Sequence, residues 1–251
     1  MDLGIAGKVT IVTGGGSGIG RATAIMMAQW GARLVVADID RGAAETTVSE
    51  IQKSGGKAEA AIVDVCIEDQ VISFFEKVSR DYGRIDILVN GVGGGKPARV
   101  AEITGSDWDS MFAFNTKSCF LCSREAARFI AASGGGRIIN VASLAGQTSS
   151  VLQGAHYSAA KAAVIGLTRH MARELGPLGI HVSAIAPGPT STERVDRQMT
   201  PERRQALISR LPLRRMATPE DQAGVILFLA SSLSNYVTGV TIDVSGGILL
   251  G

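Results

Sequence analysis

The sequence Val-Thr-Ile-Val-Thr-Gly-Gly-Gly-Ser-Gly-Ile-Gly at residues 9–20 joins an apolar run to a cluster of glycines. Residues 9–12 are mostly β-branched and predict a short buried strand, and a helical pattern follows over residues 21–30. A strand that runs into closely spaced glycines and then into a helix lets backbone N–H groups approach a phosphate at the helix N-terminus. The stretch therefore predicts a dinucleotide-binding turn, although tight turns also need glycine for geometry alone.

Strands and helices alternate along the rest of the chain. Further strands are expected at 34–37, 58–63, 85–89, 137–141, 180–185 and 240–244, and helices at 42–53, 68–82, 106–132, 155–175 and 219–231. Apolar strands separated by helices indicate a parallel sheet covered on both faces. We expect an α/β fold, a Rossmann-type doubly wound sheet of about seven strands, forming one domain over residues 1–251. The arginine-rich stretch 189–217 interrupts the alternation, and we expect it to form a substrate lid.

Composition narrows the functional classes. The chain has 251 residues, of which 45% are hydrophobic, enough for one large domain with a sizeable core. Its net charge of +2 is spread out, which argues against a nucleic-acid partner. No apolar run approaches the ~20 residues needed to cross a bilayer, and no export signal is visible. Three cysteines make no disulfide framework, so we expect a cytoplasmic protein without a membrane partner.

Asp38 follows the second expected strand and bears on the choice of cofactor. A carboxylate at this place in a Rossmann unit accepts hydrogen bonds from the adenosine ribose hydroxyls. It would also repel a 2′-phosphate, so NAD is favoured over NADP. Arg33 and Arg41 lie close in the sequence and are the candidates for sheltering such a phosphate.

Tyr157 and Lys161 are four residues apart in the expected helix 155–175, so their side chains should be neighbours on one face. A tyrosine pKa of ~10 must fall by about 3 units, or roughly 4 kcal/mol, before the phenol exchanges protons readily near neutrality. A fixed cation nearby could supply that shift. Pairs of this kind also occur on helix surfaces without any function.

Several motifs in a fixed order resemble the short-chain dehydrogenase/reductase family over nearly the whole chain. They are Thr13-Gly-x-x-x-Gly-Ile-Gly20, Asp64-Val65, Asn90, Asn115, Ser143, Tyr157-x-x-x-Lys161, and Pro187-Gly188 followed by Thr192. One such motif is common by chance, but the ordered set is not.

The resemblance implies four catalytic residues. Tyr157 would be the general acid/base at the substrate oxygen, and Lys161 would hold the nicotinamide ribose and lower the pKa of the tyrosine. Ser143 would position the same oxygen, although a serine after a strand is also a common turn or cap residue. Asn115 would help to hold a water through which the proton reaches solvent, or would be a buried helix residue. A base within reach of that oxygen fits the chemistry, because hydride leaves a carbinol carbon more readily as its oxygen loses a proton.

The resemblance also implies a set of cofactor contacts. Asp64 and Val65 would contact adenine, and Pro187, Gly188 and Thr192 would lie around the nicotinamide. The full set is Gly14, Ser17, Gly18, Ile19, Asp38, Asp64, Val65, Asn90, Gly91, Tyr157, Lys161, Pro187, Gly188, Thr190 and Thr192.

The chain departs from the family pattern beside the expected site. Where the family usually has Asn-Asn-Ala-Gly, this chain has Asn90-Gly91-Val92-Gly93, followed by Gly94-Gly95-Lys96, and the extra glycines suggest a looser loop. The lid stretch carries arginines that form a solvated surface or, with Lys96 and Arg99, attract an anionic substrate. These arginines are Arg194, Arg197, Arg203, Arg204, Arg210, Arg214 and Arg215.

Two other signals carry little weight. Cys119 and Cys122 have a Cys-x-x-Cys spacing, but they fall inside a helix with no second pair or nearby histidine, so we expect core residues and no metal site. His156 should point away from Tyr157 and either line the substrate mouth or lie on the surface.

The sequence thus predicts an NAD-dependent oxidoreductase that transfers hydride between nicotinamide and a small-molecule secondary alcohol or ketone. One alternative is an NADP-dependent 3-oxoacyl-acyl-carrier-protein reductase, and another is a dinucleotide-sensing protein that has lost the chemistry. The resemblance further implies a homotetramer with helices 106–132 and 155–175 and the last strand at its interfaces.

Overall fold

Seven parallel strands form the sheet in the computed structural model, which describes residues 2–150 and 152–249, and their order is β3-β2-β1-β4-β5-β6-β7. The strands are β1 (Val9–Thr13), β2 (Arg33–Asp38), β3 (Lys57–Ile62), β4 (Ile87–Asn90), β5 (Gly136–Val141), β6 (Ile180–Pro187) and β7 (Thr241–Val244). The order reverses between β1 and β4, where a doubly wound sheet opens a crevice at the carboxyl ends of its strands. The predicted fold class is confirmed.

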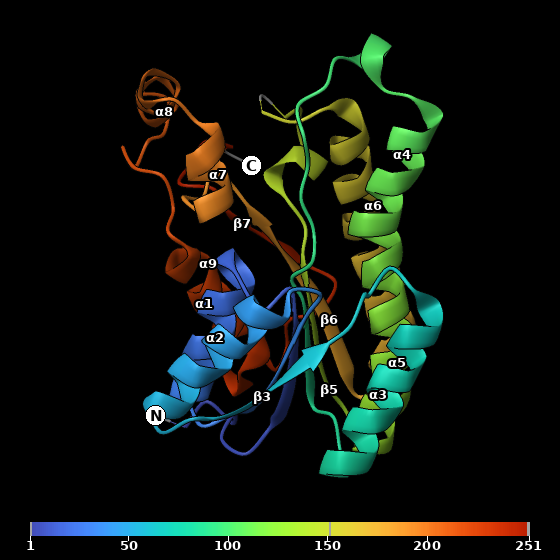
Figure 1. Cartoon of the computed structure of the whole chain (residues 1–251). Coiled ribbons are helices and arrows are strands. Elements are labelled where there is room, and N and C mark those ends of the chain that lie inside the picture. Colours follow the sequence, from blue (N-terminus) through green and yellow to red (C-terminus); the bar gives the residue numbers. More distant parts are fainter. Residues whose placement is uncertain (1, 151, 250–251) are drawn as a thin grey trace.

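Helices cover both faces of the sheet (Figure 1). They are α1 (Gly18–Gln29), α2 (Arg41–Lys53), α3 (Glu68–Tyr82), α4 (Gly105–Phe112), α5 (Ser118–Ala132), α6 (Ala155–Leu175), α7 (Glu193–Gln198), α8 (Pro201–Ile208) and α9 (Pro219–Ala230). Figure 1 shows α1, α2 and α9 on one side and α3, α5 and α6 on the other. Alternate strand residues face opposite layers, so Ile11 packs in the α3–α5 layer while Val12 packs in the α1–α9 layer.

The expected helix 106–132 is interrupted. A π-turn, Ala113–Lys117, separates α4 from α5, and Asn115 lies buried within it. Such turns insert an extra residue into an α-helix and often occur at functional sites. Here the turn brings the side chain of Asn115 to the loop that follows β4.

The expected lid is more regular than its polar sequence indicates. Residues 189–217 contain α7 and α8, which begin at the capping residues Thr192 and Thr200. Leu207, Leu211 and Met216 give this segment a small apolar cluster of its own. Residues 189–217 therefore have a small core of their own, and their role as a lid stays a prediction.

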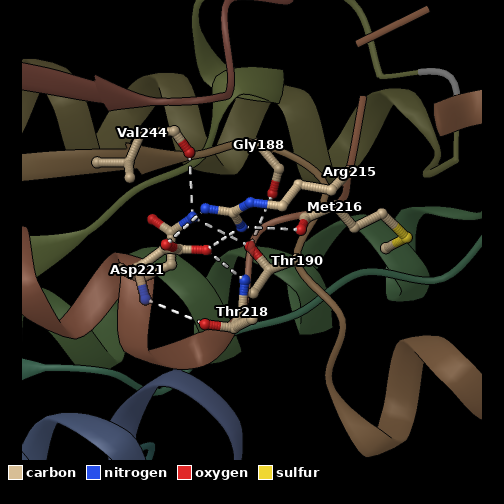
Figure 2. A network of polar contacts seen from close by, with 8 residues as sticks. Gly188, Thr190, Arg215, Met216, Thr218, Asp221 and Val244 are labelled. Atoms are coloured by element: carbon tan, nitrogen blue, oxygen red, sulfur yellow. Dashed lines mark hydrogen bonds and ion pairs between the residues drawn. The ribbon is translucent and has the colours of Figure 1, made fainter. Parts of the chain in front are cut away.

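A polar network joins the end of the lid to α9 (Figure 2). Arg215 donates to Asp221 at 2.9 Å, and Thr218 caps α9 by accepting from the Asp221 backbone N–H at 3.3 Å. On the sheet side, the Gln222 amide donates to Thr190 at 3.1 Å and to the Val244 carbonyl at 3.0 Å. The lid is thus held to the sheet and α9 at its two ends.

Across the described residues, the structure contains no helix with both the length and the apolar character required to span a bilayer.

Candidate active site

The glycine-rich loop between β1 and α1 cannot take side chains at its narrowest points. Gly18 has φ of 50°, in the left-handed region that favours glycine, and a Cβ on Gly20 would overlap the Gly14 carbonyl. Within the described chain, Ser17 at the N-cap of α1 makes no side-chain capping bond, so it leaves the first-turn N–H groups of the helix uncapped. This arrangement suits a pyrophosphate at a helix N-terminus, and the assignment of Gly14, Ser17, Gly18 and Ile19 to that contact stays a prediction.

Asp38 closes this loop from the end of β2. One carboxylate oxygen accepts from the Gly16 N–H at 2.9 Å and the other accepts from the Asp40 N–H at 3.0 Å. Arg33 begins the same strand, so it lies roughly 16 Å away along six residues, and its guanidinium stacks over Tyr82 at 4.7 Å. Arg33 therefore cannot shelter a phosphate beside Asp38, and that expectation is wrong.

Asn90, another expected cofactor residue, forms hydrogen bonds within the protein. Asn90 is buried at the end of β4 and donates to Ser123 and to Asn140, each at 2.8 Å. Asn140 in turn donates to Thr168 on α6 at 2.9 Å. Sequence reasoning missed Asn140, although a polar residue within an apolar strand was a visible signal. These hydrogen bonds connect β4 and β5 to α5, which carries Ser123, and to α6, which carries Thr168.

Asp64 and Val65 follow β3 at the adenine end of the expected site. The Asp64 carboxylate accepts from the Cys66 N–H at 2.9 Å, while the Val65 side chain is buried in the core. The side chain of Val65 is therefore turned inward, and what this residue offers the crevice is its backbone.

Three consecutive glycines lie against three side chains of the expected site. A Cβ on Gly93 would lie 2.7 Å from Lys161 Nζ, one on Gly94 would lie 2.6 Å from Arg194 Cζ, and one on Gly95 would lie 2.8 Å from Tyr157 Cγ. At these distances an added Cβ would displace the side chain that it meets. The expectation of a looser loop is wrong, because the glycines are what allows the loop to pack so closely. We call residues 93–95 the glycine strip.

Asn115 fixes the middle of the glycine strip. Its side-chain oxygen accepts from the Gly94 N–H at 2.9 Å, and its amide donates to the Gly94 carbonyl at 3.0 Å and to the Met111 carbonyl at 3.0 Å. The residue is 1% exposed. Its side chain thus holds the loop, and its expected part in holding a water stays a prediction.

Lys161 is buried beside the strip. Its ammonium donates to the Val141 carbonyl at 2.7 Å and lies 6.0 Å from the centroid of the Tyr157 ring. Burial lowers the pKa of Lys161 to about 8, and the charge of Arg194 adds to that fall. The predicted closeness of Tyr157 and Lys161 on one helix face is observed.

Tyr157 differs from the expectation in its protonation. Burial raises its pKa above the usual value of 10, against the opposing effects of the Ser143 hydroxyl and the Arg194 charge. In this structure desolvation of the phenolate outweighs those two effects, so the expected fall of the Tyr157 pKa towards neutrality, caused by Lys161, stays a prediction. Ser143 also caps the turn after β5, since its hydroxyl accepts from the Ala145 N–H at 3.1 Å.

The buried charge of Lys161 predicts a pH dependence of stability. Between the folded pKa of about 8 and the ordinary 10.5, the unfolded chain binds a proton that the folded chain does not, so stability rises with pH in this window. Below pH 8 the folded protein carries the full cost of the buried ammonium. Relative to Lys161→Met, the wild type should gain on the order of 3 kcal/mol across this window, as measured by urea unfolding at a series of pH values. A difference that does not change with pH would contradict the assignment.

The segment after β6 forms one side of the crevice. Thr192 accepts from the Val195 N–H at 3.3 Å, and its methyl group lies 3.4 Å from the place of a Cβ on Gly18. Gly188 packs against Ser245, and Thr190 donates to the Gly188 carbonyl at 3.0 Å. Thr192 therefore faces the glycine-rich loop. The Thr190 hydroxyl instead bonds to the Gly188 carbonyl and to the Gln222 amide.

Of the remaining signals, His156 is fully buried rather than at the surface, and neither ring nitrogen has a hydrogen-bond partner among the described residues. Cys119 and Cys122 are core residues, and burial raises the pKa of the Cys119 thiol to about 11.

Comparison with known proteins places the chain among oxidoreductases. A family model described as enoyl-(acyl carrier protein) reductase matches residues 14–249. The 3-oxoacyl-acyl-carrier-protein reductase of Thermotoga maritima is 38% identical over 247 residues, which cover 98% of this chain and 99% of that one. The structure of 7 alpha-hydroxysteroid dehydrogenase complexed with NADH and 7-oxo glycochenodeoxycholic acid has a TM-score of 0.94 and 36% identity, covering 98% and 96% of the two chains. A short-chain type dehydrogenase/reductase from Mycobacterium marinum has a TM-score of 0.93 and 34% identity, covering 98% and 97%.

Proposed function

The chain belongs to the short-chain dehydrogenase/reductase family, and from this we propose that it is an NAD-dependent oxidoreductase acting on a secondary alcohol or ketone. The observation that carries the proposal is the packing of Lys161 and Tyr157 against neighbouring residues of the glycine strip, at the carboxyl ends of β4 and β5. In a doubly wound sheet this edge is where ligands bind.

The chemistry assigns a distinct part to each residue. When bound, the nicotinamide supplies or accepts the hydride. Tyr157 gives a proton to the substrate oxygen during reduction and takes it back during oxidation. Ser143 donates a hydrogen bond to the same oxygen and stabilises the charge that develops there. Lys161 provides a nearby positive charge, and Asn115 holds the loop that supports them.

The raised pKa of Tyr157 predicts how the rates of reduction and oxidation depend on pH. Because burial keeps the phenol protonated near neutrality, the residue is ready to donate a proton to a ketone. Oxidation needs the phenolate instead, so its rate should increase as the pH rises.

Asp38 supports the choice of NAD. Its carboxylate lies at the end of β2 beside the uncapped first turn of α1, where the adenosine ribose binds in a Rossmann unit. Arg41 pairs with Glu45 at 3.4 Å, so its charge is already compensated. The residues present therefore fit a dinucleotide with free ribose hydroxyls better than one with a 2′-phosphate.

A second candidate is an NADP-dependent 3-oxoacyl-acyl-carrier-protein reductase. The Thermotoga maritima relative and the description of the family model favour it. Asp38 counts against the NADP part of this alternative.

A screen of alcohols, ketones and 3-oxoacyl thioesters with NAD(H) and NADP(H) tests the proposal. We expect turnover with NAD(H) and with secondary alcohols or ketones, followed through the nicotinamide absorbance. Turnover restricted to thioesters with NADPH would select the second candidate. NADH binding without turnover of any compound would instead indicate a dinucleotide-sensing protein.

We also propose that the protein acts in the cytoplasm as a homotetramer. Trp108, Phe114 and Phe120 are 41%, 40% and 43% exposed along α4, the π-turn and α5, which gives these helices an apolar outer face suited to a partner subunit.

A further inference from the structure

Arg194 is the one lid arginine that the described contacts place against the glycine strip. It is the second residue of α7, and the three atoms nearest to a Cβ built on Gly94 all belong to its guanidinium. Asn115 holds Gly94 through both its N–H and its carbonyl. The guanidinium therefore rests on a peptide that is itself fixed in place.

Arg194 is exposed and forms no ion pair among the described residues, a property it shares with Arg203, Arg210 and Arg214, but of these four only Arg194 contacts the glycine strip in the described contacts. Among the described residues, three other lid arginines form ion pairs: Arg197 with Glu193 at 3.7 Å, Arg204 with Asp196 at 2.6 Å, and Arg215 with Asp221. Lys96 pairs with Asp107 at 2.7 Å. Arg194 has no carboxylate within 4 Å in the part of the chain that the structure describes.

The guanidinium of Arg194 lies close to Tyr157 and Lys161, the expected catalytic residues. The charge of Arg194 acts on Tyr157 and on Lys161, lowering the pKa of both. A guanidinium and a buried ammonium in one crevice leave excess positive charge there, which an anion would neutralise.

The glycine strip also sets the spacing between the cation and the reaction centre. Consecutive Cα atoms are about 3.8 Å apart, so Lys161, Arg194 and Tyr157 contact neighbouring points of one short backbone segment. The same short segment thus contacts both the Tyr157 ring and the Arg194 guanidinium, so a small substrate bound at Tyr157 would lie close to Arg194. The adjoining cavity, about 320 Å³ and lined by Pro97, Ala98, Arg99, Glu102, Leu152 and Gln153, suits a small molecule.

We propose that Arg194 binds the carboxylate of the substrate and so makes the protein selective for small hydroxy acids and the corresponding oxo acids. This inference rests on the proposed oxidoreductase function. Of the lid arginines, it assigns the binding of an anionic substrate to Arg194 alone. It also explains the glycine at position 94, because a side chain there would displace the guanidinium. A planar guanidinium binds a carboxylate through two parallel hydrogen bonds, which an ammonium cannot reproduce.

The first test compares each hydroxy acid with its methyl ester, which has the same skeleton without the charge. In Arg194→Gln, kcat/KM for the acids should fall by about 10- to 100-fold while the values for the esters stay within a few-fold. Arg197→Gln removes the same charge from the same helix away from the strip and should change neither. Equal losses for acids and esters, or a weakened NADH affinity in a direct titration, would overturn the proposal.

A second variant, Gly94→Ala, tests the contact between Gly94 and Arg194 from the glycine side. Gly94 does not need a positive φ, and an added Cβ would meet only the end of the Arg194 side chain. Gly94→Ala should therefore displace the guanidinium and reproduce the acid-specific loss. The double variant should lose no more than either single one, because both remove the same interaction. Additive losses would contradict the contact.

Calorimetry with malonate separates this inference from the proposed function. The wild type loaded with NADH should bind malonate, and Arg194→Gln should bind it at least about 10-fold more weakly. That result together with no turnover of any hydroxy acid would uphold the anion site and count against the oxidoreductase proposal. Malonate binding that is absent in the wild type or unchanged in the variant would refute the anion site.

Discussion

Replacing Tyr157 by phenylalanine should lower kcat by about 10²- to 10⁴-fold, the usual loss when a positioned acid/base is removed. The substitution removes only the hydroxyl. The ring that packs on Gly95 remains, so the shape of the crevice is preserved. NADH affinity should stay close to that of the wild type, because the ring contributes no charge to dinucleotide binding. Stopped-flow kinetics and a fluorescence titration of NADH measure the two quantities.

A matched control for this substitution lies elsewhere in the chain. Tyr82 ends α3 and its ring stacks under Arg33, outside the crevice. Tyr82→Phe removes the same hydroxyl group and should leave kcat unchanged. If Tyr157→Phe also lost NADH binding, the residue would have a structural role and the proposed chemistry would be wrong.

Replacing Asp38 by asparagine should shift the cofactor preference from NAD towards NADP by about 100-fold in the ratio of kcat/KM values. A carboxylate beside a 2′-phosphate costs several kcal/mol, and each 1.4 kcal/mol corresponds to about tenfold. Asparagine keeps one acceptor oxygen, so it can still receive the Gly16 N–H and hold the loop. The comparison needs kcat/KM for both cofactors in each protein.

Asp38→Ala separates the two roles of this carboxylate. It removes the charge and both acceptors, so it should relieve the repulsion and also loosen the loop, weakening both cofactors. If asparagine at this position left the preference unchanged, the adenosine ribose would not lie beside Asp38. The second candidate, with NADP, would then gain support.

The fold could be predicted because its signals are local. Apolar strands alternate with helices, and the bounds of α3 and α6 agree with the pattern residue by residue. The π-turn at residues 113–117 could not be foreseen, because a turn with one extra residue leaves the composition of a helix unchanged. The helices of the lid were missed although Thr192 and Thr200 are good N-caps, because the polar sequence between them suggested irregular structure.

The site could be predicted only in part. The closeness of Tyr157 and Lys161 follows from a spacing of four residues on one helix. The contact between Gly94 and Arg194 joins residues 100 positions apart in the sequence, so only the folded chain shows it. The direction of the Tyr157 pKa shift could not be read from the sequence, because it depends on burial as well as on the nearby charges that the sequence displays.

The central claim is that Asp38 receives the adenosine end of NAD while Tyr157 and Lys161 receive the nicotinamide end. A crystal structure of the protein with NADH tests both halves at once. We predict that the adenosine ribose hydroxyls donate to the Asp38 carboxylate and that the nicotinamide lies beside the Tyr157 hydroxyl. A dinucleotide whose adenosine lies away from Asp38, or whose nicotinamide lies away from Tyr157, would contradict the account.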